Sequence, residues 1–256
     1  MGRNTKIDWC DSSWNPVTGC YHDCPYCYAR GIANRFGMHL TEWKCRNIHE
    51  LDKPARKKAM PGKIGAIVPY LHDFEPTLHR YKLDEVQKWK QPRTVFVCSM
   101  ADLFGEWVPL AWIQEVFEAC RKAPQHRYLF LTKAPERYIS LAKLGQLPTE
   151  DNFWFGCSTP TPDTPYFFGE GVNTFVSIEP LHERFRYIGA AERKELPQWM
   201  IIGAETGNRK GKIVPEKEWV DEIARYAQGN GIPVFMKESL REIMGADFKQ
   251  EFPWEG

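Results

Sequence analysis

Three cysteines near the start of the chain have the residue type and the spacing for metal chemistry. Cys20, Cys24 and Cys27 stand within the segment NPVTGCYHDCPYCYAR (15–30) in the pattern C-x3-C-x2-C. Thiolates are soft ligands that suit zinc and iron–sulfur clusters. A four-coordinate site needs four ligands and this segment supplies three thiolates, so the nature of the fourth ligand decides the class of site.

Zinc, redox and iron–sulfur chemistry are the alternatives for this segment. Structural zinc sites favour two C-x2-C pairs or a Cys2His2 set, whereas the other cysteines of this chain are scattered singly. A zinc ion would need a fourth ligand, for which the candidates are His22, Cys10, Cys45 and His49. A redox C-x2-C pair would leave Cys20 without a role. A [4Fe–4S] cluster with one iron left open uses all three thiolates.

From residue 94 onward, short apolar runs that end abruptly in polar residues predict strands covered on both faces. The runs are TVFVCSMAD (94–102), RYLFLTKAP (127–135), NFWFGCSTP (152–160), NTFVSIEPL (173–181), WMIIGAETG (199–207) and IPVFMKES (232–239). Helical patterns over 109–123, 135–146 and 215–231 each open on proline. The connection 159–172 contains three prolines and is expected to be a loop. Strands alternating with helices predict an α/β fold, a full or partial (β/α) barrel of mainly parallel strands.

The polar residues at the strand ends form the second group of candidate site residues. In parallel α/β folds, ligands bind at the carboxyl ends of the strands, where the loops converge. The residues expected at this rim are Ser99, Asp102, Thr132, Lys133, Ser158, Thr159, Ser177, Glu179, Glu205, Thr206, Lys237 and Glu238.

Composition limits the class of protein further. The chain has 256 residues and a formal net charge of +1, which fits one barrel-sized domain over 1–256 with an insertion at about 37–75. The N-terminus has no apolar targeting segment, and no run approaches eighteen apolar residues. We therefore expect a soluble cytoplasmic protein with reduced thiols and no membrane partner.

The cysteine run resembles the signature of the radical S-adenosylmethionine (SAM) superfamily, in which an aromatic residue, here Tyr26, precedes the last cysteine. The wider pattern resembles a phage-associated branch of that superfamily without an assigned reaction, so the cytoplasm would be that of the host. The segments that carry this resemblance are NPVTGC, DFEPTLHRYKLDEV, FVCSMADLF, VSIEPL, IIGAETG and VFMK.

The resemblance implies a β/α barrel whose N-terminal loop binds a [4Fe–4S] cluster through Cys20, Cys24 and Cys27. SAM would be the fourth ligand, and an electron donor such as flavodoxin or ferredoxin would reduce the cluster. Cleavage of SAM would then give a 5′-deoxyadenosyl radical, which abstracts hydrogen from the substrate. The residues expected to contact SAM are Tyr26, Ser99, Asp102, Lys133, Ser158, Glu179, Gly203 and Glu205.

This chain departs from the family pattern at one element, and two further residues are candidates for a role at the site. The Gly-Gly-Glu element of the family is absent, and Ser99 and Asp102 stand in its place. Lys237 is a candidate for holding the methionine carboxylate or an anionic substrate. Cys157 is a candidate hydrogen-atom donor.

The substrate is predicted from charge and from the phage resemblance. Lys53, Arg56, Lys57, Lys58 and Lys63 form a basic stretch with no acidic residue, which could contact phosphates. The leading hypothesis is an isomerase- or lyase-type radical enzyme that rearranges or repairs a nucleobase or base adduct in DNA or a nucleotide. The alternatives are a peptide- or protein-modifying radical SAM enzyme and a non-enzymatic, zinc-stabilised nucleic-acid-binding module.

Overall fold

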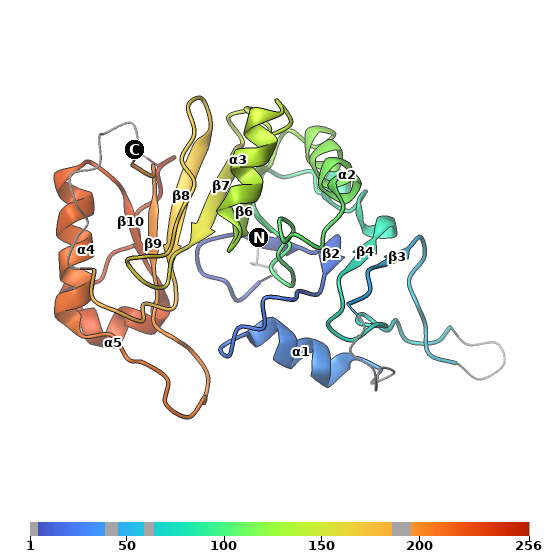
Figure 1. Cartoon of the computed structure of the whole chain (residues 1–256), viewed down its shortest axis with the longest axis horizontal. Helices are drawn as coiled ribbons and strands as arrows, with labels where there is room; N and C mark the ends of the chain where they lie inside the picture. Colours follow the sequence, from blue (N-terminus) through green and yellow to red (C-terminus); the bar gives the residue numbers. More distant parts are fainter. Residues whose placement is uncertain (1–4, 39–45, 59–63, 186–195, 256) are drawn as a thin grey trace. The chain divides into compact units, whose positions relative to one another are not determined.

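The computed structural model describes residues 5–38, 46–58, 64–185 and 196–255, and it shows an α/β protein (Figure 1). These residues gather into two compact units. We call them the cysteine unit, Ser12–Tyr128, and the C-terminal unit, Met1–Asp11 with Leu129–Gly256. The single domain expected over 1–256 and its insertion at about 37–75 stay predictions.

The strands run parallel wherever their register is defined in the main sheet. Hydrogen bonds join its strands in the order β1-β5-β6-β7-β8-β9-β10, and a second sheet has the order β2-β4-β3. The pairs β1–β5, β7–β8, β8–β9 and β9–β10 are parallel. The strands are β1 (Ser12–Trp14), β2 (Val17–Thr18), β3 (His49–Leu51), β4 (Thr77–His79), β5 (Thr94–Val97), β6 (Arg127–Thr132), β7 (Phe153–Ser158), β8 (Asn173–Ile178), β9 (Met200–Ile202) and β10 (Val234–Met236). The expected α/β class with parallel strands is confirmed.

Three of the helices, α2, α3 and α4, lie within the ranges expected from the sequence, whereas α1 and α5 were not predicted. They are α1 (Tyr28–Phe36), α2 (Leu110–Arg121), α3 (Pro135–Lys143), α4 (Lys217–Gly229) and α5 (Arg241–Met244). Pro109 is the N-cap of α2 rather than its first helical residue. The proline-rich connection 159–172 has no helix, as expected. Within the described ranges no helix is both long and apolar enough to cross a membrane.

The sheet of the C-terminal unit has one apolar face. Its other face is aromatic along the strands and polar at their carboxyl ends. Val176, Ile178 and Ile202 pack with Val220 and Ile223 of α4 in a buried cluster, and Figure 1 shows α4 running beside β10. Successive strand residues point to opposite faces. The other face therefore carries buried aromatic rings such as Phe175 and Phe235, and then polar residues at the strand ends.

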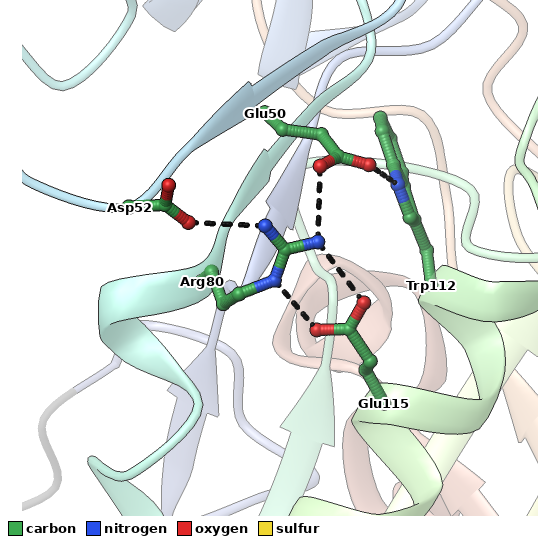
Figure 2. A network of polar contacts seen from close by, with 5 residues as sticks. All are labelled: Glu50, Asp52, Arg80, Trp112 and Glu115. Carbon is green, nitrogen blue, oxygen red and sulfur yellow. Dashed lines mark hydrogen bonds and ion pairs between the residues drawn. The ribbon is translucent and has the colours of Figure 1, made fainter.

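An arginine joins the second sheet of the cysteine unit to α2 (Figure 2). Arg80 donates two hydrogen bonds to Glu115, at 2.8 and 3.1 Å, and one each to Asp52 and Glu50 at 3.0 Å. The indole of Trp112 donates to the second oxygen of Glu50 at 2.6 Å. Bidentate Arg–carboxylate pairs in a network are stronger than isolated surface pairs.

Replacing Arg80 by alanine is expected to lower the free energy of unfolding by about 1–2 kcal/mol, because three carboxylates lose their shared cation. The value is modest because the Arg80 side chain is 36% exposed to water. Urea denaturation at low and high salt measures the loss. Arg121→Ala, which removes an exposed pair with Glu118, is the control and should change stability by less than about 0.5 kcal/mol. Equal losses in the two variants would contradict the network.

The same network predicts the direction of an acid effect. The hydrogen bonds from Trp112 and then Arg80 hold the pKa of the Glu50 carboxyl below its usual range. A lowered folded-state pKa means that the contribution of Glu50 is complete above its unfolded pKa. That contribution is lost as the pH falls through the lower, folded-state pKa.

Candidate metal and cofactor site

The loop that carries the three cysteines is fixed in the cysteine unit by its first glycine. The Gly19 amide donates to the carbonyl of Met100 at 2.9 Å, and the Cys20 amide donates to the carbonyl of Phe74 at 3.1 Å. Gly19 has a φ of +88°, and a Cβ there would lie 2.2 Å from the backbone oxygen of Glu75. Only glycine fits this conformation and this contact. The loop is therefore held between two backbone segments that are distant in sequence.

Backbone amides donate to the sulfurs of Cys20 and Cys27. The Cys27 Sγ accepts a hydrogen bond from the Arg30 amide at 3.4 Å, because Cys27 is the N-cap of α1. The Cys20 Sγ accepts from the His22 amide at 3.5 Å. Helix N-termini and N–H donors stabilise thiolates, and hydrogen bonds to cysteine sulfurs tune the potential of iron–sulfur clusters. The local backbone is suited to anionic sulfur.

Apolar side chains pack beside the same sulfurs. Ala29 and Ala33 of α1 form a buried cluster with Phe74 and Met100, and Cys20 and Cys27 pack against it. This packing removes water from one side of the cysteine loop. It also accounts for the position of α1, whose buried face is made by these two alanines.

Three thiols within one loop are the kind of donors that an iron–sulfur cluster would use. Burial, together with the nearby Asp102, Cys24 and Cys27, raises the pKa of the Cys20 thiol to about 12, although the hydrogen bond from the His22 amide lowers it. A thiol in this setting ionises when a cation binds, since metal ligation deprotonates thiols. Within the described ranges, no three His, Cys, Asp or Glu side chains form a group that could hold a metal ion. A cubane cluster differs from a single ion because each thiolate binds a separate iron, so its ligands stand farther apart.

The fourth zinc ligands considered from sequence are placed as follows. His22 bonds through Nε2 to Asp102 at 2.7 Å, and His49 bonds through Nε2 to Glu75 at 2.6 Å. Cys10 is buried in the C-terminal unit. Cys45 lies outside the described residues.

Two of the predicted SAM contacts, Ser99 and Asp102, belong to the cysteine unit and have protein partners there. Asp102 is buried, accepts a hydrogen bond from the Phe104 amide at 3.0 Å and pairs with His22. Ser99 Oγ donates to Asn15 Oδ1 at 3.2 Å. The structure thus brings Asp102 to the cysteine loop through His22, a link that sequence spacing did not indicate.

The third predicted SAM contact of the cysteine unit, Tyr26, lies inside the loop and is half-buried. The next tyrosine, Tyr28, donates from its hydroxyl to the carbonyl of Ser99 at 2.6 Å. Asn15 also accepts from the Met100 amide at 2.9 Å. Asn15 and Gly19 both belong to the segment NPVTGC, so their role in fixing the loop explains why that segment precedes the cysteines.

A second polar group lies at the strand ends of the C-terminal unit. The Lys133 ammonium donates to Ser158 Oγ at 2.7 Å, and Ser158 Oγ donates to the carbonyl of Glu179 at 3.3 Å. The Glu179 carboxylate forms an ion pair with Lys237. Gly203 lies between the last two, since a Cβ there would come within 2.9 Å of the Lys237 side chain and 3.2 Å of Glu179. The structure therefore brings together five of the sequence-predicted residues.

Two further predicted residues, Glu205 and Cys157, form hydrogen bonds with other residues, Arg209 and Phe167. Both Glu205 oxygens accept from the guanidinium of Arg209, at 2.5 and 2.6 Å, and this lowers the pKa of the carboxyl. The Cys157 Sγ is fully buried and accepts from the Phe167 amide at 3.2 Å. Because Cys157 and Ser158 are consecutive strand residues, they face opposite sides of the sheet. The roles predicted for Glu205 and Cys157 stay predictions.

The fold and the two polar groups define an α/β protein with parallel strands, a three-cysteine loop and a set of ligand-type residues at strand ends. The chain belongs to the family described as protein of unknown function (DUF5131), which matches residues 4–242. It is similar to the uncharacterized protein ORF301 of Acidianus two-tailed virus, with 29% identity over 168 residues. That match covers 53% of this chain and 54% of the viral protein, so the chain spans about half the length of this relative. No solved structure gives a significant match.

Proposed function

We propose that this protein is a radical SAM enzyme whose cluster is held by Cys20, Cys24 and Cys27. The observation that carries the proposal is the anchored C-x3-C-x2-C loop, in which amides point at two sulfurs and apolar residues pack beside them. The parallel strands with helices between them support the finer proposal of a full or partial β/α barrel. The viral origin of the similar protein agrees with the phage-associated resemblance.

The residues of the cysteine unit would divide the work at the cofactors. The three thiolates would bind iron, and the amides of His22 and Arg30 would stabilise the charge on sulfur. Asp102, oriented by His22, would receive the ammonium group of SAM. When bound and reduced, the cluster would supply the electron that cleaves SAM to methionine and a 5′-deoxyadenosyl radical. The donor of that electron would be a flavodoxin- or ferredoxin-type protein.

The decisive test is anaerobic purification followed by metal analysis and a SAM-cleavage assay. We expect a brown protein with about four irons per chain. After reduction with dithionite, it should form 5′-deoxyadenosine from SAM. A colourless protein with one zinc per chain would contradict the proposal and favour the zinc-stabilised nucleic-acid-binding module.

The proposed substrate is a nucleobase or base adduct in DNA or a nucleotide, and the basic stretch supplies the observation that favours it. Lys57 donates its amide to the carbonyl of Ala66, and Arg56 donates through Nη1 to the carbonyl of Gly65. These contacts pair two backbone segments and leave Lys57 and Lys58 exposed. Lys63 lies outside the described residues.

Charge reversal of Lys57 and Lys58 to glutamate is expected to weaken DNA binding about tenfold or more. Removal of two phosphate contacts should also reduce the slope of log K against log salt by about two. Fluorescence anisotropy with a labelled duplex at several salt concentrations measures both quantities. The control reverses Lys88 and Lys90, two exposed lysines of the same unit, and should change the slope less. Salt-independent binding by the unmodified protein would refute the DNA hypothesis and leave the cofactor proposal standing.

A further inference from the structure

The strand ends of the C-terminal unit place a set of polar side chains on one face of the sheet. Ser158 of β7 is in register with Ser177 of β8. Ile178 is in register with Ile202, and Ile202 with Met236. The next residue of each of these three strands is Glu179, Gly203 and Lys237 in turn. Because side chains alternate along a strand, Ser177 and Glu179 share a face, and the parallel register puts Ser158 and Lys237 on it as well.

The missing side chain of Gly203 lets two charges meet across the middle strand. Glu179 and Lys237 flank Gly203 and form an ion pair. The amides of Gly203 and Lys237 continue the parallel pattern, donating to the carbonyls of Ile178 and Ile202 at 3.1 and 2.8 Å. Both charged side chains are partly exposed, Lys237 by 17% and Glu179 by 24%. An ammonium group has three hydrogens, so the bond to Glu179 leaves Lys237 able to donate to a ligand.

The hydroxyl of Ser177 is buried on the same face as this pair. Ser177 is 1% exposed, and its Oγ has no partner among the described residues. Its cross-strand neighbour Ser158 bonds to Lys133 and to the carbonyl of Glu179. Buried hydroxyls are satisfied in most native structures, and an orphan needs a cause such as a ligand.

The charges and donors of this group suit an oxyanion. Lys133 and Lys237 bring two positive charges, and Glu179 brings one negative charge, which leaves an excess of one positive charge. Ser177 adds a hydroxyl donor. Phosphate oxygens accept hydrogen bonds from ammonium and hydroxyl groups, and the carboxyl ends of parallel strands are where such ligands bind in α/β folds.

We propose that Lys133, Ser158, Ser177, Glu179 and Lys237 bind a phosphate group of the substrate. Lys133, Lys237 and Ser177 donate to the phosphate oxygens, and Ser158 and Glu179 hold the two lysines in place. This assignment rests on the proposed function only in that the phosphate belongs to the nucleotide substrate. It replaces the SAM contacts predicted for Lys133, Ser158 and Glu179 from sequence.

Isothermal titration calorimetry on the anaerobically purified full chain tests the site with inorganic phosphate, thymidine monophosphate, thymidine and SAM. We expect phosphate and the nucleotide to bind and the nucleoside to bind at least tenfold more weakly than the nucleotide. Lys133→Met and Lys237→Met should each weaken phosphate binding about tenfold or more, as loss of a charged hydrogen bond does. Lys212→Met is the control, since Lys212 is exposed and donates to the carbonyl of Gly207 at 3.2 Å.

Ser177→Ala separates ligand binding from folding. It removes a buried hydroxyl that has no partner in the described structure, so the melting temperature should stay the same or rise. Phosphate binding should nevertheless weaken about threefold to tenfold. Unchanged phosphate binding in Ser177→Ala and in both lysine variants would overturn the proposal.

The titration with SAM and the iron content distinguish failure of the phosphate proposal from failure of the radical SAM proposal. If the lysine variants lose SAM binding and keep phosphate binding, the group belongs to the carboxylate of the cosubstrate and the phosphate proposal is wrong. Absence of iron with phosphate binding intact would refute the radical SAM proposal alone. Iron and SAM cleavage without phosphate binding would refute the phosphate site alone.

Discussion

Replacing Cys24 by alanine is expected to abolish the brown colour, the bound iron and the formation of 5′-deoxyadenosine. The proposed cluster would have no spare protein ligand, because its fourth iron would be bound by SAM. The amides of Gly19 and Cys20 anchor the loop backbone, and this substitution leaves both of these hydrogen bonds in place. The variant should therefore fold. Its iron content should drop from about four irons per chain to the background level. In the SAM-cleavage assay, the formation of 5′-deoxyadenosine should also drop to background.

Cys120→Ala is the matched control for this experiment. Cys120 is fully buried in α2 and packs in the core of the cysteine unit. Its replacement should reduce stability by about 1 kcal/mol and leave iron and activity unchanged. Full iron content and undiminished SAM cleavage in Cys24→Ala would show that Cys24 is not a ligand.

Replacing Gly19 by alanine is expected to have an effect almost as large, through the backbone. The new Cβ would stand 2.2 Å from the Glu75 carbonyl oxygen and 2.7 Å from the Pro76 nitrogen, and the φ of +88° is strained for any other residue. Backbone atoms cannot rotate away as a flexible side chain can, so the loop or the segment 74–76 must move. We expect a loss of about 2–4 kcal/mol in the free energy of unfolding and a severe loss of iron.

Gly31→Ala provides the control a few residues away. Gly31 lies in α1, and a Cβ there would have no heavy atom within 4 Å. Alanine is the better helix former by about 0.5–1 kcal/mol, so this variant should be as stable as the parent or more stable and should keep its iron. Chemical denaturation and iron analysis on both variants measure the contrast. Equal iron content in the two would refute the anchoring role of Gly19.

Local signals explain which parts of the fold could be predicted. The apolar runs that became β5 to β10 are each several residues long and end in polar residues, so burial on both faces is visible in the sequence itself. The helices α2, α3 and α4 have regular apolar periodicity and a proline near the start. By contrast, β1 and β2 lie in the segment SSWNPVTGC, which contains no extended apolar run. Pairing with strands that are distant in sequence decides their structure.

The site residues divide in the same way. The three cysteines lie within one short segment, and their chemistry follows from spacing. Asp102 reaches the cysteine loop through His22, which is 80 residues away in sequence. Ser99 was predicted to contact SAM and this stays a prediction, but the hydrogen bond from its hydroxyl to Asn15, 84 residues away, could not be predicted. Such pairings depend on which segments the fold places side by side, and no spacing rule reports them.

The α/β class, the positions of β5 to β10 and of α2 to α4 along the chain, and the clustered thiols of the loop could be predicted from the sequence. These features depend on interactions between residues close together in the chain. By contrast, the ion pair of Glu179 and Lys237 across Gly203, and the buried hydroxyl of Ser177 that has no partner in the described residues, depend on how the strands pair. The physical reason is register: parallel strands joined by long connections align residues far apart in sequence, and hydrogen bonding between strands sets that alignment.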